Sequence, residues 1–300
     1  FFMLKITVPT TFIVILLKYL GFIKYIAMVF KPLMTIFGIR GEAALVIITG
    51  NLVNIYGAVA AMATLTFTVK EVTIISIILL FSHSLIIESA VIRSLKVPIY
   101  KQLLVRIGAA VFSGILLNLL IGNNYQEIAF KTKINTENIP KINPFFPWVK
   151  DLISTYFHTI LNTAIQLIII ITAILLGLEI LKELKVLDKL NSLFYRLTKH
   201  LGVTKPANFS LLVGFLIGIT YGASAILVNY KEGSMNKKDV ALVTTFLLLC
   251  HAIIEDMFIF ISKGAVPWII ILYRVGFTII VIYLYNILLY ATEKRTEKLL

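Results

Sequence analysis

The stretch CHAIIEDMFIFISKGAVP, which runs from Cys250 to Pro267, decides the fold. It places a histidine, a glutamate and an aspartate among Ile, Met and Phe. A charged group at membrane depth costs at least ~2.5 kcal/mol on insertion scales, so such groups usually turn toward a bundle interior or a water-filled cavity. The stretch therefore predicts a helix whose polar side packs inside a protein rather than against lipid.

The composition of the whole chain agrees with a membrane location. Of the 300 residues, 59% are hydrophobic and only 14% are charged, and the mean hydropathy is +0.95. Apolar runs at residues 166–181, at 240–250 with its continuation, and at 266–289 approach or exceed the ~20 residues that a membrane-crossing helix needs. These runs are continuous, whereas the strands of a membrane barrel alternate in polarity. We therefore expect an all-α polytopic, multi-pass protein of the cell membrane.

Charge and cysteine content narrow the expected partners. The 28 Lys and Arg outnumber the 15 Asp and Glu, which gives a net charge of +13. Cytoplasmic loops and anionic lipid head groups explain this excess better than nucleic acid does. Cys250 is the only cysteine, so an internal disulfide is excluded. The first residues lack a basic region followed by a small-residue cleavage site, and no removable signal peptide is expected.

The chain repeats itself. The stretch SHSLIIESAVIRSLKVP, from Ser82 to Pro98, resembles the stretch that begins at Cys250. We predict two homologous halves, residues 1–122 and 159–300, joined by a polar, proline-containing extramembrane linker at 123–158. The pairs that match at a shift of 168 are His83 with His251, Glu88 with Asp256, Arg106 with Arg274, and Gly108 with Gly276.

Each half presents its segments in the same order. A membrane helix comes first, and an amphipathic segment follows at residues 23–38 and 187–202, where apolar residues at helical spacing alternate with lysines. These two segments are predicted to lie in the membrane interface. A Gly-rich apolar segment, the helix with the histidine, a Pro-containing turn and a last helix with the arginine complete each half.

The two halves are either parallel or inverted, depending on whether the Gly-rich segment crosses the membrane or turns back. Without the intramembrane Arg274, an inverted arrangement collects 17 of the remaining 27 basic residues on one side, and a parallel one collects 15. The positive-inside rule therefore favours inversion, with both termini in the cytoplasm.

These motifs resemble a known family. The Tyr-Gly-Ala stretches at Tyr56 and Tyr221, the two histidine helices, the Val-Pro turns and the Arg-x-Gly sequences resemble the Gate, or nucleoside-recognition, domain. This domain occurs in the spore maturation proteins A and B and twice in the bacterial ferrous-iron transporter, and the resemblance covers nearly the whole chain. The pattern is also similar to the core of concentrative nucleoside transporters. The resemblance implies inverted halves, each with an interfacial helix, a re-entrant hairpin and a broken helix.

The sequence departs from these relatives in two ways. It contains no G-x-x-x-x-G-K-[ST] loop, so coupling to GTP hydrolysis on this chain is excluded. The residue before each histidine is Ser82 in one half and Cys250 in the other, whereas the gate of the iron transporter implies thiols in both halves. Ferrous iron is therefore a less favoured cargo.

The buried ionisable groups allow two interpretations. In the first, they form one solute or ion site between the repeats, with carboxylate oxygens for a cation or a polar solute and titratable imidazoles. In the second, Glu88 and Asp256 only neutralise Arg106 and Arg274 in a structural network. The candidate binding residues of the first interpretation are His83, Glu88, His251, Glu255 and Asp256. No cofactor is expected, although a coupling sodium ion or proton is compatible with this set.

The Gly-rich segments add neutral candidates. Gly57 and Gly222 are predicted at the turns of the two hairpins, where exposed helix ends bind solute in transporters. Ordinary packing of small residues between helices is the alternative. The neighbouring hydrogen-bonding candidates are Asn54, Tyr56, Tyr221 and Ser224.

The favoured function is therefore transport or binding of a small polar or ionic solute, nucleoside-like first and a divalent cation second. A membrane scaffold or assembly partner that does not transport is the alternative. No G-x-S-x-G or H-E-x-x-H motif occurs, so we do not expect an enzyme. A homo-oligomer or a pair with a related membrane protein is compatible with the sequence.

Cysteine labelling tests the inverted topology. Single cysteines placed in the linker between Lys133 and Lys141 are expected to react from the side opposite to a cysteine near Lys96, because inversion separates these loops across the membrane. The variants carry Cys250→Ala so that only the new thiol reacts. Reaction of both positions from the same side would rule out inversion.

Overall fold

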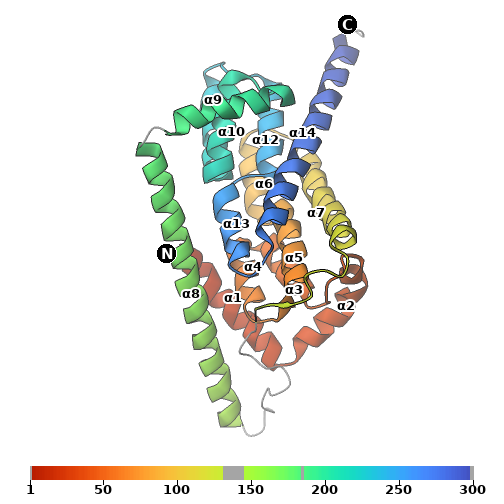
Figure 1. Cartoon of the computed structure of the whole chain (residues 1–300), viewed down its shortest axis with the longest axis vertical. Helices are drawn as coiled ribbons and strands as arrows, with labels where there is room; N and C mark the ends of the chain where they lie inside the picture. The colour runs from red at the N-terminus through yellow and green to blue at the C-terminus, as the bar shows by residue number, and fades with distance from the viewer. Residues whose placement is uncertain (1, 131–144, 184–185, 298–300) are drawn as a thin grey trace. The chain divides into compact units, whose positions relative to one another are not determined.

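The chain is helical almost throughout (Figure 1). The computed structural model describes residues 2–130, 145–183 and 186–297. In the first half the helices are α1 (Phe2–Tyr19), α2 (Phe22–Ile36), α3 (Ala43–Leu52), α4 (Ile55–Met62), α5 (Val69–Ser82), α6 (Leu85–Ser94) and α7 (Ile99–Ile121). In the second half they are α8 (Phe145–Glu183), α9 (Val186–Thr198), the 3-10 turn η2 (Lys199–Leu201), α10 (Lys205–Ile217), α11 (Ile219–Lys231), α12 (Lys237–Leu249), α13 (Ile253–Ile261) and α14 (Pro267–Glu297).

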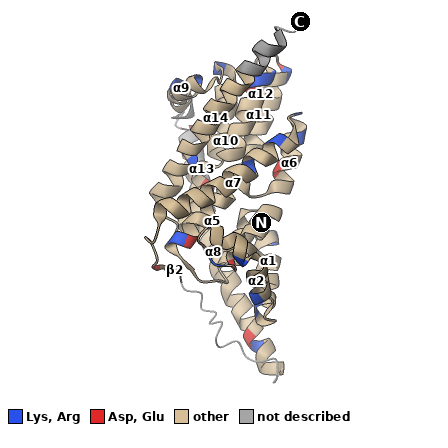
Figure 2. Ribbon diagram, turned by 90° about the vertical axis from the view of Figure 1, so that its right-hand side faces the viewer, with Lys and Arg blue, Asp and Glu red and all other residues tan. Residues whose placement is uncertain are grey.

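The helices confirm the expectation of an all-α polytopic membrane protein. Five helical segments in the described part of the chain are long and apolar enough to cross a membrane, or six if the bent pair α1 and α2 counts as one span. Figure 2 shows charged residues at scattered places on otherwise uncharged helices. The strands in the described residues are β1 (Phe67–Thr68) and β2 (Ile128–Phe130), which pair antiparallel.

The two predicted interfacial segments are helices α2 and α9. A bend of 93° separates α1 from α2 at Gly21, whose φ of 74° lies in the left-handed region that glycine tolerates best. In the second half α9 runs crosswise to α10 (Figure 1). An apolar stripe with basic residues between is the pattern of a helix that lies in the interface rather than across the bilayer.

Both Gly-rich segments are broken, as predicted, but the breaks lie earlier than predicted. The turn between α3 and α4 falls at Val53 and Asn54, and the turn between α10 and α11 falls at Gly218, whose φ is 132°. The prediction of turns at Gly57 and Gly222 is therefore wrong by about one helical turn. Only glycine adopts the backbone of Gly218 without strain, and this fixes the position of that turn.

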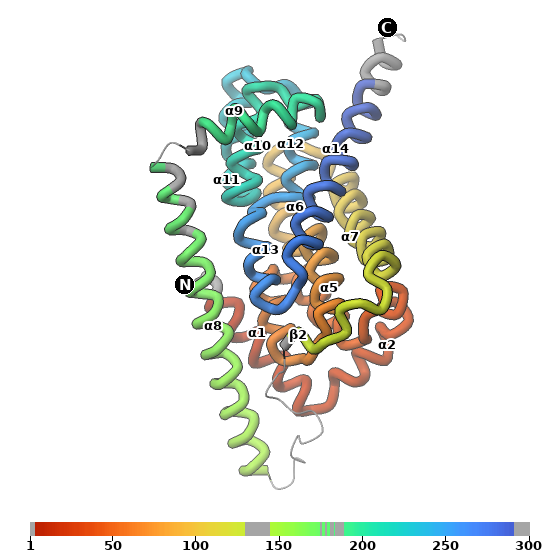
Figure 3. Tube along the Cα trace, in the orientation of Figure 1, coloured from red at the N-terminus to blue at the C-terminus, as the bar shows by residue number. Residues whose placement is uncertain are grey.

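The second glycine of the α10–α11 hairpin has a packing function instead. A Cβ atom on Gly222 would lie 2.8 Å from the Cα of Gly214 and 2.6 Å from Leu247 Cδ1. The two half-helices therefore lie in direct backbone contact, side by side in Figure 3. At 1.5 Å per residue each is roughly 20 Å long or less, too short to cross a hydrocarbon core of about 30 Å. This geometry fits a hairpin that enters and leaves on one side.

The helices with the histidines are also broken, and a capping box begins each of them. Thr68 and Glu71 cap the start of α5, and Asn236 and Asp239 cap the start of α12, each with the side chain of one residue bonded to the backbone of the other. The first helix of each pair ends at Ser82 or Leu249. After the break, Ser84 and Ala252 both have a positive φ, at 53° and 43°.

The predicted linker is partly helical. Its residues 131–144 lie outside the described part of the chain, but α8 begins at Phe145 and continues to Glu183. At 1.5 Å per residue its 39 residues extend for roughly 58 Å, far more than one membrane crossing needs. The first turns of α8 pack on α1 through Trp148 and Leu152, so the end of the predicted linker belongs to the packed structure.

The chain forms two compact units, and each takes segments from both halves of the sequence. Unit 1 comprises residues 1–86, 108–172 and 258–270, and unit 2 comprises residues 87–107, 173–257 and 271–300. In unit 1, α1 packs on α2 and α4, and α3 packs on α5. In unit 2, the hairpin of α10 and α11 packs on α12.

Unit 1 buries a lysine in the turn between α13 and α14, outside the candidate spans. The ammonium of Lys263 donates to Gln166 Oε1 at 2.6 Å. Burial lowers the pKa of Lys263 from its ordinary 10.5 to about 8, because the charged form loses hydration. The folded protein therefore bears the cost of a buried charge at neutral pH.

Lys263 gives a pH-dependent stability. Below pH 8 both the folded and the unfolded chain hold its proton, whereas between about pH 8 and 10.5 the unfolded chain binds more protons, so stability rises with pH in this window. The rise is about 3 kcal/mol at most. We expect Lys263→Met to remove this contribution from unfolding midpoints measured between pH 7.5 and 10, and Lys24→Met, at an exposed site, to retain it. Equal pH profiles for the two variants would contradict the assignment.

Candidate functional site

The candidate site lies in unit 2, at the break between α12 and α13. When α12 ends at Leu249, its last carbonyl groups lose their helical partners. Arg274 of α14 donates its Nε to the carbonyl oxygen of Leu249 at 3.0 Å, and its Nη1 and Nη2 each lie 3.3 Å from Oδ2 of Asp256. Asp256 is in the first turn of α13. The cation therefore meets the negative end of one half-helix, and the anion lies at the positive end of the next.

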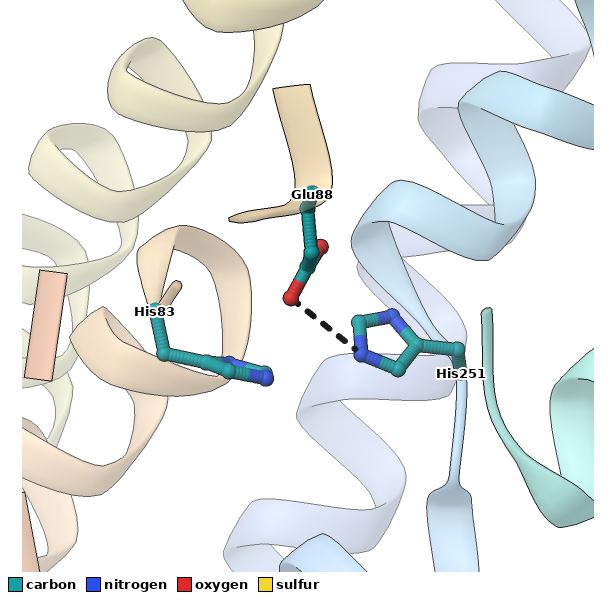
Figure 4. Close-up of side chains that lie close together, drawn as sticks. All are labelled: His83, Glu88 and His251. Carbon is teal, nitrogen blue, oxygen red and sulfur yellow. Dashed lines mark ion pairs between the residues drawn. The ribbon is translucent and has the colours of Figure 1, made fainter. Parts of the chain in front are cut away.

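A second ion pair lies in the same unit. Glu88 Oε2, in the first turn of α6, is 3.1 Å from Arg106 Nη1 of α7. The other carboxylate oxygen, Oε1, is 3.6 Å from Nε2 of His251, and Figure 4 shows the imidazole ring turned toward this oxygen. The carboxylate of Glu88 therefore lies between a guanidinium of α7 and the histidine at the break after α12.

The contacts of His251 determine its tautomer. Its Nδ1 lies 2.6 Å from the carbonyl oxygen of Leu247, and a carbonyl oxygen only accepts hydrogen bonds. Nδ1 therefore carries the hydrogen, and in the neutral ring Nε2 presents a lone pair toward Glu88. A hydrogen-bond donor placed here would therefore lie near both Oε1 of Glu88 and Nε2 of His251.

The burial of this cluster, which we call the charged cluster, is nearly complete. Arg106 and Arg274 have exposed fractions of 0%, and Glu88, His251 and Asp256 have 4% each. Two carboxylates balance two guanidinium groups, which is the condition under which charges persist in a low-dielectric interior. The pairs of Glu88 with Arg106 and of Asp256 with Arg274 are those that the structural-network interpretation expects.

Glu255 differs from its neighbour Asp256. It lies in the first turn of α13 and is half-buried. Arg274 forms its ion pair with Asp256. The charge of Glu255 can therefore be tested separately from that pair.

His83 belongs to unit 1, at the C-terminal end of α5. Its Nδ1 lies 2.8 Å from the carbonyl oxygen of Leu79, so it has the same tautomer as His251 at the matching position. The local structure around both histidines thus follows the shift of 168 found in the sequence.

In unit 1, the predicted hairpin residues serve the turn itself. Asn54 is the N-cap of α4, and its Oδ1 accepts a hydrogen bond from the backbone N–H of Gly57 at 3.0 Å. Gly57 is buried inside the first turn of α4, and the neighbouring Tyr56 is half-buried. Asn54 therefore has a structural function as a cap, which a sequence search for N-cap residues would have found.

In unit 2, the predicted hairpin residues lie on α11. Tyr221 is 62% exposed, and Ser224 is exposed and donates to the carbonyl oxygen of Thr220 at 2.9 Å. Gly222 faces α10 and α12. The structure thus separates Gly222, a packing residue, from Tyr221, whose ring is open to its surroundings.

Sequence reasoning missed the residues that hold the breaks. Ser84 N–H donates to the carbonyl oxygen of Gly50 at 2.9 Å, and Ala252 N–H donates to that of Gly214 at 3.2 Å. The signal was present, because Gly50 and Gly214 both lie in the Gly-rich segments. Sequence spacing alone could not show that the backbone of Ser84 bonds to Gly50, or that of Ala252 to Gly214.

Several helices long and apolar enough to span a membrane, together with buried charges at a helix break, define a polytopic membrane protein. The model of the Gate family, described as nucleoside recognition, matches residues 164–266. The chain is 32% identical over 271 residues to "Uncharacterized membrane protein YvoD" of Bacillus subtilis (strain 168), covering 90% of this chain and 85% of that protein. The chain belongs to the Gate nucleoside-recognition family. No solved structure matches it.

The pair of Arg274 with Asp256 should be essential for stability. Arg274→Gln leaves a buried carboxylate without its cation, and a loss of about 3–5 kcal/mol is expected. Glu255→Gln, next to the pair, is the matched control and should cost less, because it leaves the ion pair of Asp256 with Arg274 in place. Thermal unfolding of the purified variants in detergent checks both values. An Arg274→Gln protein as stable as the control would contradict this function of the pair.

Proposed function

We propose that the chain is a transporter that binds a small polar solute at the charged cluster of unit 2, with a nucleoside-like solute favoured and a divalent cation second. One observation carries the proposal. At the break between α12 and α13, His251 lies next to Glu88, which pairs with Arg106, and Asp256 pairs with Arg274, with nearly all of their surface buried. Helices that stop inside a membrane, with ionisable groups at the break, are where transporters of this type bind their solutes.

The chemistry of the cluster supports a solute with hydrogen-bond donors. Oε1 of Glu88 and Nε2 of His251 are neighbouring acceptors, 3.6 Å apart. Hydroxyl and amine groups, which nucleosides carry on the sugar and the base, match such acceptors. The family description, nucleoside recognition, points to the same class of solute.

The second candidate function is a membrane scaffold that does not transport, in which the charged cluster only stabilises the fold. Both carboxylates have an arginine within 3.3 Å, so the ion pairs alone explain why the charges are tolerated. The two candidates differ in whether a solute changes the stability of the folded protein.

We also propose that both termini are cytoplasmic and that the halves are inverted. The charge distribution supports this arrangement, because inversion gives the larger excess of basic residues on one side. A bacterial relative that is itself a membrane protein makes the cell membrane the expected location.

Binding tests decide between the two candidates. Adenosine, uridine and Mn²⁺ are added separately to the purified full chain, and the unfolding midpoint is measured. A ligand at 100 times its Kd stabilises the folded state by about 2.7 kcal/mol. We expect a shift with at least one nucleoside, and uptake of that nucleoside into proteoliposomes.

Two variants connect the shift to this region, because His251 belongs to the charged cluster and Glu255 is the neighbour of Asp256. Glu255→Gln and His251→Asn are expected to reduce the nucleoside shift, while Glu255→Gln keeps the stability of the ligand-free protein because the pair of Asp256 with Arg274 remains. A shift with Mn²⁺ alone would favour the cation. If no probe shifts the midpoint of a well-folded protein, the scaffold becomes the better description.

A further inference from the structure

A second site in unit 2 lies apart from the charged cluster, beneath the interfacial helix α9. A cavity of about 480 Å³ opens between α9 with η2 and the membrane helix α14, and α10 and α12 close it from behind. This volume lies in the range of small-molecule binding sites. The rings of Phe194, Phe215 and Phe246 line one part of it. Phe215 lies tilted against Phe194 and edge-to-face with Phe246, with centroids 5.3 and 6.1 Å apart.

The lining of the cavity is mostly apolar, and several of its apolar side chains are exposed. Leu197, Ile280 and Leu284 line it and keep exposed fractions of 67%, 59% and 54%. Ile280 and Leu284 belong to the candidate span Pro267–Tyr290. An apolar cavity beside a candidate span fits an acyl chain.

Basic residues are frequent in the segment beside the cavity. Residues 189–205, which include the part of α9 that lines the cavity, contain four lysines and arginines and neither Asp nor Glu. Arg196 and Lys199 are exposed at the end of α9 and on η2, and His200 lines the cavity itself. Basic residues next to an interfacial helix attract the phosphate of anionic lipids.

We propose that this cavity binds one anionic phospholipid, with an acyl chain between α9 and α14 and the phosphate at Arg196 and Lys199. The apolar cavity alone accepts the chain of any phospholipid, so the basic residues set the preference for a negative head group. The site does not depend on whether the protein transports a solute.

Lipid binding to the purified full chain tests the head-group preference. Phosphatidylglycerol and phosphatidylcholine with identical acyl chains are added in detergent, and bound lipid is counted by native mass spectrometry beside the unfolding midpoint. We expect tighter binding of phosphatidylglycerol, and a loss of roughly 30-fold in the double variant Arg196→Gln/Lys199→Gln, since each basic residue near a membrane surface contributes about 1 kcal/mol and about 1.4 kcal/mol is tenfold. The matched control is Lys24→Gln/Lys31→Gln on α2, where both lysines are exposed.

The acyl chain has its own test. Ile280→Trp fills the cavity and is expected to reduce binding of both lipids, whereas Ile287→Trp, two turns later on α14 and outside the cavity, should bind as the parent does. Glycerol 3-phosphate alone should leave the midpoint unchanged. The proposal fails if the two lipids bind equally, if the double variant keeps the preference, if Ile280→Trp behaves like its control, or if glycerol 3-phosphate reproduces the shift.

Discussion

A helix that stops inside a membrane must find new partners for the backbone groups that its end sets free, since no water is there to take them. In unit 2 the break after α12 meets this need from two directions. Arg274 donates to the carbonyl oxygen of Leu249, and the carbonyl oxygen of Gly214 accepts from Ala252 N–H. The α10–α11 hairpin and the buried arginine are therefore required by the break, and the carboxylate of Asp256 is required by the arginine.

Much of this fold could be predicted from the sequence, because the need to satisfy backbone groups inside a membrane is visible in the spacing of apolar, polar and charged residues. Apolar length predicts the spans, and the shift of 168 finds both arginines and both histidines. The turn at Gly218 could not be predicted in place, because several glycines in one apolar segment all permit a turn and only tertiary contacts select one. The packing of Gly222 against Leu247 and Gly214 is one such tertiary contact. Spacing likewise cannot tell a binding carboxylate from one that neutralises an arginine.

Sequence reasoning could likewise predict only part of the candidate site. That Glu88 and Asp256 face arginines was one of two interpretations open from the sequence, and the distances of 3.1 and 3.3 Å agree with it. The position of Glu88 next to His251 was not open to sequence reasoning, since their elements are far apart in the chain. An ion pair and a solute site are compatible here, because a carboxylate with two oxygens can hold a guanidinium with one and present the other.

At corresponding positions, the two halves share hydrogen bonds even where their residues differ. Thr68 and Glu71 in one half and Asn236 and Asp239 in the other make the same capping box with different side chains. Ser84 and Ala252 share only a positive φ and a bond to a glycine carbonyl. Those positions need a backbone geometry rather than a side chain, whereas both histidines keep their identity and their bond to a leucine carbonyl four residues earlier. The leucine carbonyl at each position can orient an imidazole ring only if a histidine is there. This part of the fold therefore needs the histidine itself and not only a given backbone geometry.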